Sequence, residues 1–130
     1  MMNRRRARLL IVDDSRVIRE LLGQMFGEMP GVELLGYAET ADDAIAAILA
    51  QRPDCVLLDL NLKSGTGINV LQAIHPQLPK VVFIVMSNNE GEKYRQACMA
   101  AGACHFLDKT NDFNKIRFVV DCLDLSEASD

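Results

Sequence analysis

RLLIVDDSRVIREL (residues 8–21) contains the transition that decides the fold of this chain. Its first part is apolar and becomes β-branched toward its end, whereas from Ser15 onward the apolar residues recur at helical spacing. Asp13 and Asp14 stand between this strand and this helix. Either Asp14 or Ser15 could cap the helix, but adjacent carboxylates also raise one another's pKa unless a cation stabilises them.

The same strand-then-helix pattern continues along the chain. We expect strands at residues 9–12, 32–38, 55–60, 81–87 and 104–109. Helical patterns follow them at residues 15–29, 40–51, 68–74, 92–103 and 113–123, and Thr40 with Asp43 is typical of a capping box. Apolar strands that alternate with helices predict an α/β fold in which a parallel sheet is covered on both faces.

Polar residues follow the ends of four of these strands. They are Asp13, Asp14, Asp59, Ser87 and Lys109. Ligands of parallel sheets bind at the carboxyl ends of strands, so we expect these side chains to converge. Three carboxylates favour a hard divalent cation, and Mg²⁺ prefers oxygen ligands. Taken one at a time, each residue could equally serve a turn, a helix cap or a solvated loop.

From about Arg8 to Leu123 the chain resembles the receiver domains of two-component response regulators. The resemblance is carried by the acidic pair, an acceptor aspartate, a glycine eight residues later, a hydroxyl, an aromatic residue and a lysine. These are Asp13 and Asp14, Asp59, Gly67, Ser87, Phe106 and Lys109. The resemblance implies a flavodoxin-like receiver fold, with a five-stranded parallel sheet of order 2-1-3-4-5 and helices on both faces.

The resemblance also implies a function in phosphorelay signal transduction in bacteria. Asp59 would accept a phosphoryl group from a sensor histidine kinase or a histidine phosphotransfer protein, as a covalent aspartyl phosphate. Lys109 would stabilise charge on the transferring oxygens. The protein would then be a signalling phospho-acceptor that catalyses only its own phosphoryl transfer and dephosphorylation, and not an enzyme acting on a separate substrate.

The resemblance assigns further residues to the metal and to the switch. Mg²⁺ would be held by Asp14, Asp59 and the backbone carbonyl of Asn61, with Asp13 acting largely through a bound water. After transfer, Ser87 would turn toward the phosphoryl group and free space for the Phe106 ring. This two-state switch would change the face formed by the last two helices and the fifth strand, where a downstream protein would bind. Phosphoryl hydrolysis would be tuned by three asparagines, Asn61, Asn88 and Asn89.

Two positions depart from the family pattern. Lys63 stands where a proline is usual four residues after the acceptor, and Thr110 stands where a proline usually follows the lysine. The second proline normally forms a cis peptide bond, so its absence bears on the loop that carries Lys109. Asn88 is bulkier than the small residue often found after the hydroxyl, and it could restrict the access of phosphodonors or water.

Length and composition bound the remaining choices. The chain has 130 residues, 49% of them hydrophobic, and we expect one receiver domain at residues 8–124 between a basic tail at 1–7 and a polar tail at 125–130. No apolar run approaches a membrane span, so we expect a soluble cytoplasmic protein that binds neither membranes nor, by itself, nucleic acid. Its four cysteines show no CxxC spacing and are expected to be buried, reduced thiols.

Three alternatives to a working receiver remain open. An aspartate-nucleophile, Mg²⁺-dependent phosphatase would place its two acids two residues apart after the first strand, where this chain has adjacent acids. A flavodoxin-like flavin protein would need a glycine- and hydroxyl-rich phosphate loop in place of DDSR (residues 13–16). A receiver-like interaction module that is not phosphorylated is the hardest to separate. A homodimer is also possible.

Overall fold

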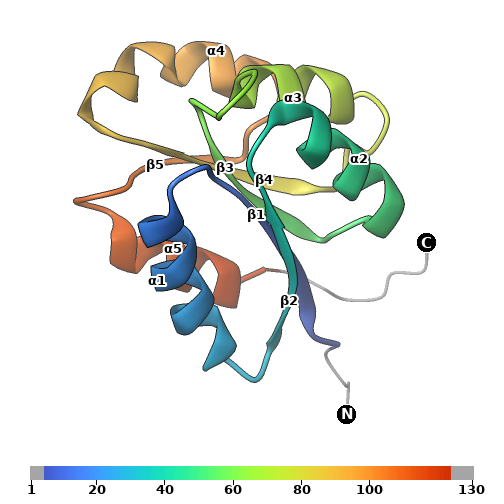
Figure 1. Cartoon of the computed structure of the whole chain (residues 1–130), viewed down its shortest axis with the longest axis vertical. Coiled ribbons are helices and arrows are strands. Elements are labelled where there is room, and N and C mark those ends of the chain that lie inside the picture. Colours follow the sequence, from blue (N-terminus) through green and yellow to red (C-terminus); the bar gives the residue numbers. More distant parts are fainter. Residues whose placement is uncertain (1–4, 124–130) are drawn as a thin grey trace.

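The computed structural model describes residues 5–123, with the backbone alone at residues 89–91, and these residues form a parallel sheet between two layers of helices (Figure 1). The strands are β1 (Ala7–Val12), β2 (Val32–Ala38), β3 (Cys55–Asp59), β4 (Val82–Ser87) and β5 (His105–Asp108). Their order is β2-β1-β3-β4-β5, and every neighbouring pair is parallel. The structure therefore confirms the α/β fold and the strand order 2-1-3-4-5.

Helices cover both faces of the sheet (Figure 1). They are α1 (Arg16–Gly27), α2 (Ala41–Gln51), α3 (Gly67–Ile74), α4 (Arg95–Ala100) and α5 (Phe113–Asp121), with a 3₁₀ helix, η1 (Asn89–Tyr94), before α4. α1 and α5 pack on one face, and α2, α3 and α4 pack on the other. None of the helices described is both long and apolar enough to cross a membrane.

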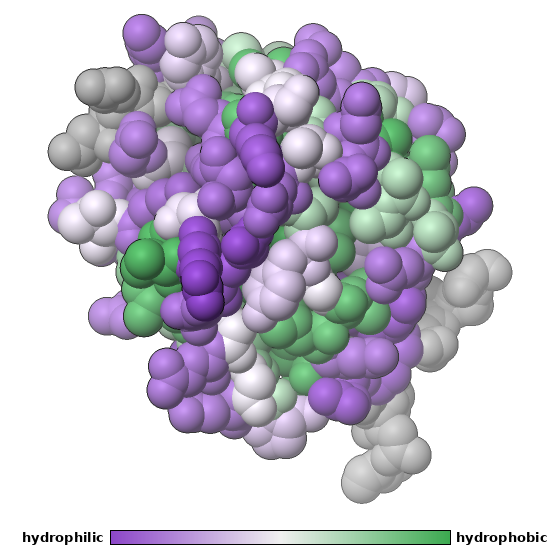
Figure 2. Space-filling model, in the orientation of Figure 1, coloured by the Kyte–Doolittle hydropathy of each residue, from purple (hydrophilic) through white to green (hydrophobic). Residues whose placement is uncertain are grey.

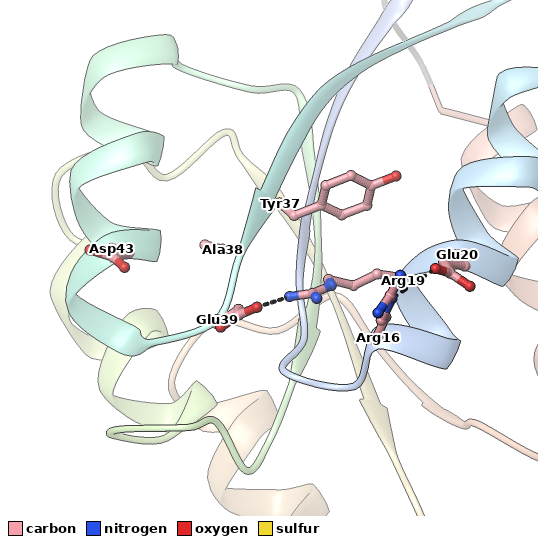
Figure 3. A pocket seen from close by; sticks show the side chains of 7 residues that line it. All are labelled: Arg16, Arg19, Glu20, Tyr37, Ala38, Glu39 and Asp43. Atoms are coloured by element: carbon pink, nitrogen blue, oxygen red, sulfur yellow. Dashed lines mark hydrogen bonds and ion pairs between the residues drawn. The ribbon is translucent and has the colours of Figure 1, made fainter.

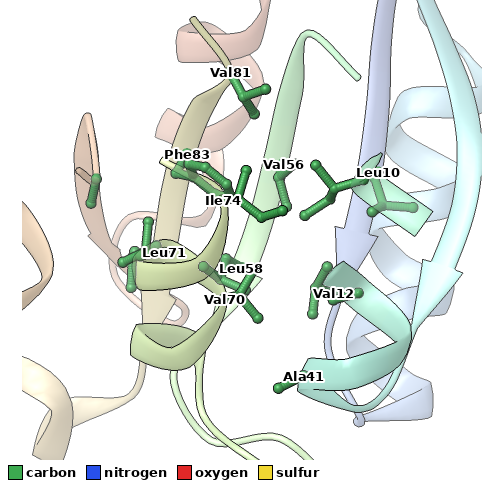
Figure 4. Packing of buried hydrophobic residues seen from close by; sticks show 14 of the residues in the cluster. Leu10, Val12, Ala41, Val56, Leu58, Val70, Leu71, Ile74, Val81 and Phe83 are labelled. Carbon is green, nitrogen blue, oxygen red and sulfur yellow. The ribbon is translucent and has the colours of Figure 1, made fainter. Parts of the chain in front are cut away.

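Neighbouring residues of each strand serve two separate cores. In β1, Leu9 and Ile11 pack toward α1 and α5, whereas Leu10 and Val12 pack toward α2 and α3. The three central strands, β1, β3 and β4, are apolar almost throughout because both of their faces are buried. Figure 4 shows the core under α2, α3 and α4, in which the α3 residues Val70 and Ile74 pack against strand residues.

Side-chain caps fix the beginnings of three helices. Ser15 Oγ accepts a hydrogen bond from Ile18 N at 3.3 Å, so Ser15 and not Asp14 caps α1. Thr40 Oγ1 accepts from Asp43 N at 3.0 Å, which confirms the predicted cap of α2. The reciprocal capping box forms at α3 instead, between Thr66 and Asn69. The cap at Ser15 leaves the Asp14 carboxylate available for another role.

The predicted helix at residues 92–103 is wrong in its first part. Residues 89–94 form the 3₁₀ helix η1, and the α-helix begins only at Arg95 and ends at Ala100. The described side chains of η1, residues 92–94, are exposed, so no apolar stripe packs this segment against the core in an α-helical register. The other predicted strands and helices are present, and their ends differ from the prediction by at most two residues.

The prediction that all four cysteines are buried is wrong for two of them. Cys55 and Cys98 are buried, but Cys104 and Cys122 are exposed, and all four are free thiols. Cys104 lies in the turn before β5 and Cys122 is the C-cap residue of α5, so both lie outside the packed interiors of their elements. An apolar neighbourhood in the sequence therefore did not identify which cysteines face the core.

At the amino ends of the strands, arginines from the start of the chain bind the folded body. Arg5 makes a two-point ion pair with Asp54, with N–O distances of 2.7 and 2.8 Å. Arg6 donates to Val32 O at 2.7 Å, and Arg8 donates to the carbonyls of Gln51 and Arg52 at the end of α2. Basic residues that we assigned to the tail at 1–7 thus contact the sheet edge; the tail at 125–130 lies outside the described residues.

Candidate functional site

Three carboxylates meet at the carboxyl ends of β1 and β3. Asp13 and Asp14 directly follow β1, and Asp59 is the last residue of β3. One carboxylate oxygen from each of the three lies within 4.8 Å of the others. Asp13 is fully buried and Asp59 is 7% exposed, whereas Asp14 is exposed. The site therefore has two buried acids at its base and a third acid at its opening.

Local hydrogen bonds hold Asp13 in place. Its backbone N–H donates to Ala38 O at 3.0 Å, which continues the pairing of β1 with β2. Its Oδ1 accepts a hydrogen bond from Ser15 N at 2.8 Å. The turn that starts α1 thus fixes one oxygen of Asp13 and leaves Oδ2 directed at the other charges of the site.

Lys109 is the cation that the two buried acids share. Its Nζ lies 2.8 Å from Asp13 Oδ2 and 3.2 Å from Asp59 Oδ2. Burial disfavours the ammonium, but its close contact with Asp13 and the charges of both carboxylates outweigh this effect and raise the pKa of Lys109. Lys109 therefore stays charged at neutral pH and links the ends of β1, β3 and β5.

The surroundings of Asp59 disfavour the ionised form of its carboxyl group. Burial, with added repulsion from Asp13, raises the pKa of Asp59 from 3.8 to about 6, although Lys109 and a hydrogen bond from the backbone of Asn61 act in the opposite direction. The Asn61 N–H lies 3.4 Å from Asp59 Oδ1. Gly67 lies against the backbone here, since a Cβ at that position would stand 2.5 Å from Asp59 O. The loop after β3 can therefore close over Asp59 only with a glycine at 67.

The donor set fits a hard divalent cation. With all groups ionised, three carboxylates and one ammonium leave a net charge of −2 at the site. The buried Asp13 Oδ2 receives no hydrogen bond of good geometry within the described part of the chain, although Lys109 Nζ is close to it. Oxygen donors, excess negative charge and the raised pKa of Asp59 are together what Mg²⁺ or a similar ion would relieve.

Ser87 and Phe106 lie on the same face of the sheet as α4. Side chains alternate along β4, so Ser87 shares the face of Phe83 and Val85, both members of the core under α2, α3 and α4. Phe106 pairs with Val85 in register and belongs to that core. Both are buried, with 4% of each residue exposed. The hydroxyl at the site and the aromatic ring are therefore neighbours on one surface of the sheet.

The sequence analysis missed Arg95, which covers Phe106. The Arg95 guanidinium carbon lies 4.7 Å from the centre of the Phe106 ring, within the range of a cation–π interaction. Arg95 Nε also pairs with Glu92 Oε2 at 2.6 Å, and the hydrogen bond to Glu92 raises the pKa of Arg95. The exposed side of the ring is thus closed by a charged residue of α4, and only a three-dimensional structure could reveal this contact.

The two positions that depart from the family pattern each use a backbone N–H that a proline would lack. Lys63 N donates to Glu39 O at 3.0 Å. Thr110 N donates to Asp108 Oδ1 at 2.7 Å. The described chain contains no cis peptide bond, and the loop after Lys109 is held by hydrogen bonds to Asp108. Asp108 is a second residue that the sequence analysis missed.

The structure describes the side chains of two of the three asparagines predicted to tune hydrolysis. Asn61 and Asn88 are exposed, and in the chain they lie two residues after Asp59 and one residue after Ser87. Asn89 begins η1, and its side chain lies outside the described part of the structure. Their roles therefore remain predictions.

A cavity of about 560 Å³ lies between the start of α1 and the carboxyl end of β2 (Figure 3). It is lined by Arg16, Arg19, Glu20, Tyr37, Ala38, Glu39 and Asp43. Figure 3 shows Arg19 of α1 reaching Glu39 after β2, and these two residues form an ion pair. None of the three clustered acids lines this cavity, so we assign the chemistry to the acid cluster, where buried charges converge.

Comparisons with known proteins agree with this geometry. Residues 9–121 match the family described as "Response regulator receiver domain". A protein-glutamate methylesterase/protein-glutamine glutaminase of Geobacter sulfurreducens is 33% identical over 105 residues, which are 81% of this chain and 28% of that protein. A homologue of the same description from Anaeromyxobacter dehalogenans is 38% identical over 109 residues, 81% of this chain and 30% of its own length.

A solved structure with the same fold is the receiver domain of NtrX from Brucella abortus. It is 28% identical, has a TM-score of 0.78, and the match covers 87% of this chain and 94% of that one. This chain spans less than a third of the length of the two curated relatives named above. Their similarity to it is therefore confined to the receiver part.

Proposed function

Because the chain belongs to the response regulator receiver domain family, we propose that it accepts a phosphoryl group on Asp59 and signals in a two-component pathway. The observation that carries this proposal is the pair of buried carboxylates, Asp13 and Asp59, bridged by Lys109. Receiver domains generally partner histidine kinases, and we infer a sensor histidine kinase or a histidine phosphotransfer protein as the donor. The esterase and glutaminase activities named for the relatives form no part of the proposal.

In the proposed reaction, an Asp59 carboxylate oxygen attacks the phosphorus atom of a phosphohistidine. The new O–P bond forms as the P–N bond breaks, and the bond's electron pair goes to the departing imidazole nitrogen. Lys109 lies within ion-pair distance of Asp59 and donates to the oxygens on which negative charge accumulates. Transfer changes the charge carried by Asp59 from −1 to about −2, by analogy with other phosphorylated side chains. The site needs additional donors for that charge.

We infer that Asp14, Asp59 and the backbone carbonyl of Asn61 hold Mg²⁺, with Asp13 acting through a water. When bound, the ion supplies positive charge to the phosphoryl oxygens. Asp13 keeps Lys109 in position, because their ion pair is buried and short. The Ser87 hydroxyl lies on the face shared with Phe106, and it is the donor that we expect to turn toward the phosphoryl group. Asn61, Asn88 and Asn89 are proposed to set the rate of hydrolysis.

The proposal is tested by measuring the intact mass of the protein with phosphoramidate, a small P–N donor, in the presence and absence of Mg²⁺. We expect the wild type to gain one phosphoryl group only when Mg²⁺ is present. Asp59→Asn should not gain it, because the amide is not a nucleophile of comparable strength. Asp42→Asn changes an exposed aspartate at the start of α2 and serves as the matched control.

Two results would contradict the proposal. Phosphorylation of Asp59→Asn at the wild-type rate would place the acceptor elsewhere. A wild type that gains no phosphoryl group from phosphoramidate, nor from a phosphorylated histidine phosphotransfer protein, would favour the alternative of an interaction module that is not phosphorylated. The second donor is needed because Asn88 could restrict a small molecule and a partner protein differently.

We further infer that the output passes through the face formed by α4, β5 and α5. Phe106 in β5 is buried under Arg95 of α4, so movement of the ring would change the exposed surface there. Tyr94 and Met99, on η1 and α4, are among the exposed large hydrophobic residues. Hydrophobic residues form separate patches among hydrophilic ones in the view of Figure 2. A downstream protein captured equally by the phosphorylated and unphosphorylated forms would contradict this inference.

A further inference from the structure

The loop that carries Lys109 is closed by hydrogen bonds to the two aspartates at its ends, Asp108 and Asp112. Asp108 Oδ1 accepts hydrogen bonds from Thr110 N at 2.7 Å and from Asn111 N at 2.8 Å. Asp112 Oδ2 accepts from Asp108 N at 2.9 Å, and Asp112 N donates to Asp108 O at 2.9 Å. Four hydrogen bonds therefore close the segment Asp108–Asp112 around Lys109.

The Asp112 carboxylate accepts a hydrogen bond from the backbone of this loop and from no backbone N–H of the helix that it precedes. Asp112 is the N-cap residue of α5, but its side chain makes no capping hydrogen bond to that helix. Its carboxylate instead binds Asp108 N and pairs with Lys115 at 3.3 Å. α5 therefore lacks a stabilising side-chain cap at its N-terminus, and the loop has an additional hydrogen-bond acceptor instead.

The segment also fixes where the Lys109 backbone lies. Lys109 N donates to Ser87 O at 2.7 Å, which extends the pairing of β4 with β5 by one step. Beyond this hydrogen bond the chain must turn, and the Asp108 carboxylate is the group that binds the first two N–H groups of that turn. From this anchored backbone, Nζ reaches Asp13 and Asp59 at 2.8 and 3.2 Å.

We propose that Asp108 is a positioning residue of the phospho-acceptor site, whose carboxylate fixes the turn so that Lys109 Nζ stands between Asp13 and Asp59. This inference rests on the proposed function. Asp108 touches none of the reacting groups and acts through Lys109. The Asp108 carboxylate can order this turn because Thr110 has a backbone N–H to donate. A proline at position 110 would lack that donor.

The test compares Asp108→Ala, which removes the acceptor, with Asp108→Asn, which keeps an oxygen at the same place but removes the charge. We measure the rate of phosphorylation by phosphoramidate at saturating Mg²⁺. Asp108→Ala should slow the reaction roughly tenfold, because misplacing a group near the reacting atoms is costly to the rate. Asp108→Asn should stay within about threefold of the wild type, since its oxygen can accept both N–H groups.

Both changes are repeated in a Lys109→Met background to separate positioning from a general loss of structure. If Asp108 acts through Lys109, Asp108→Ala has no further effect once the lysine is gone. An equal slowing in both backgrounds would overturn the proposal, as would equal rates for Asp108→Ala and the wild type. Asp42→Ala is the control for loss of a surface aspartate.

A second measurement does not depend on phosphorylation. Nuclear magnetic resonance relaxation of the Lys109 ¹³Cε group reports how well the side chain is ordered. We expect lower order in Asp108→Ala and wild-type order in Asp108→Asn; unchanged order in Asp108→Ala would contradict the proposal. If the wild type is not phosphorylated, the proposed function fails while this measurement still decides whether Asp108 positions Lys109.

Discussion

Two aspartates at opposite ends of β3 have opposite electrostatic environments. Asp54, just before the strand, is partly buried, but Arg5 and the backbone N–H of Arg8 more than compensate and lower its pKa. Asp59, at the other end, shares one ammonium with Asp13, and burial raises its pKa to about 6. The amino end of the strand is thus neutralised by the chain itself, whereas the carboxyl end is left with excess negative charge.

The difference separates residues that stabilise the fold from residues that are available to react. Asp54 accepts three hydrogen bonds in total, from Arg5 and Arg8, and has little left to gain from another ligand. Asp59 would gain from a cation or from a change of its own charge. A single short strand therefore carries a stabilising carboxylate at one end and the proposed phospho-acceptor at the other.

The largest expected effect comes from removing the shared cation. Lys109→Met leaves Asp13 fully buried without its ion-pair partner, and we expect the free energy of unfolding to fall by about 3 kcal/mol at pH 7.5 without divalent ions. Urea denaturation measures this change, and Mg²⁺ should restore part of it. Arg5→Met at the other end of the sheet should cost about 1 kcal/mol, because that pair is partly exposed. Equal losses would remove the distinction between the two ends.

The second-largest expected effect is an increase in the free energy of unfolding, caused by removing the charge of Asp59. Because the pKa of Asp59 is raised, its contribution to stability is fully present below pH 3.8 and is lost as the pH rises through about 6. Asp59→Asn should therefore make the metal-free protein more stable than the wild type above pH 7, by about 2 kcal/mol, with almost no difference at about pH 3. Thermal unfolding across this pH range measures it. Saturating Mg²⁺ should stabilise the wild type more than the variant, and a gain that does not depend on pH would contradict the assignment.

The smallest effect is at Asp54. Its pKa is lowered, so its contribution is present above the unfolded pKa and is lost as the pH falls through the lower folded value. Asp54→Asn should destabilise the protein by about 1 kcal/mol at pH 7, and the loss should shrink below pH 4. The same unfolding series measures it. A stabilising effect of Asp54→Asn would show that the two ends of β3 do not differ as described.

The sequence predicted most of the architecture because the signals were repeated and local. Five apolar strands and the helical patterns between them identified the parallel sheet, and the strand ends located Asp13, Asp14, Asp59 and Lys109, which the structure brings together. Ser87 and Phe106 also lie where the pattern indicated, on adjacent strands.

The features that the sequence did not predict depend on which groups meet in space. η1 replaced the first part of a predicted helix because its described side chains have no core to pack against. Arg95 and Phe106 are eleven positions apart, and only the packing of α4 on β5 places one over the other. Asp108 was assigned to a strand by its neighbours, and its carboxylate is seen to organise the following turn only when the hydrogen bonds are known.

The strand order has a mechanical consequence for the site. β5, which holds Phe106 and leads directly into Lys109, lies at the edge of the sheet, and β4 is its single neighbouring strand in the described part of the chain. β3, which holds Asp59, is paired on both sides, to β1 and β4. Shifting Phe106 strains one ladder of hydrogen bonds, whereas shifting Asp59 strains two. The proposed acceptor thus stands on the stiff centre of the sheet, whereas Phe106 and Lys109 stand at its more compliant edge.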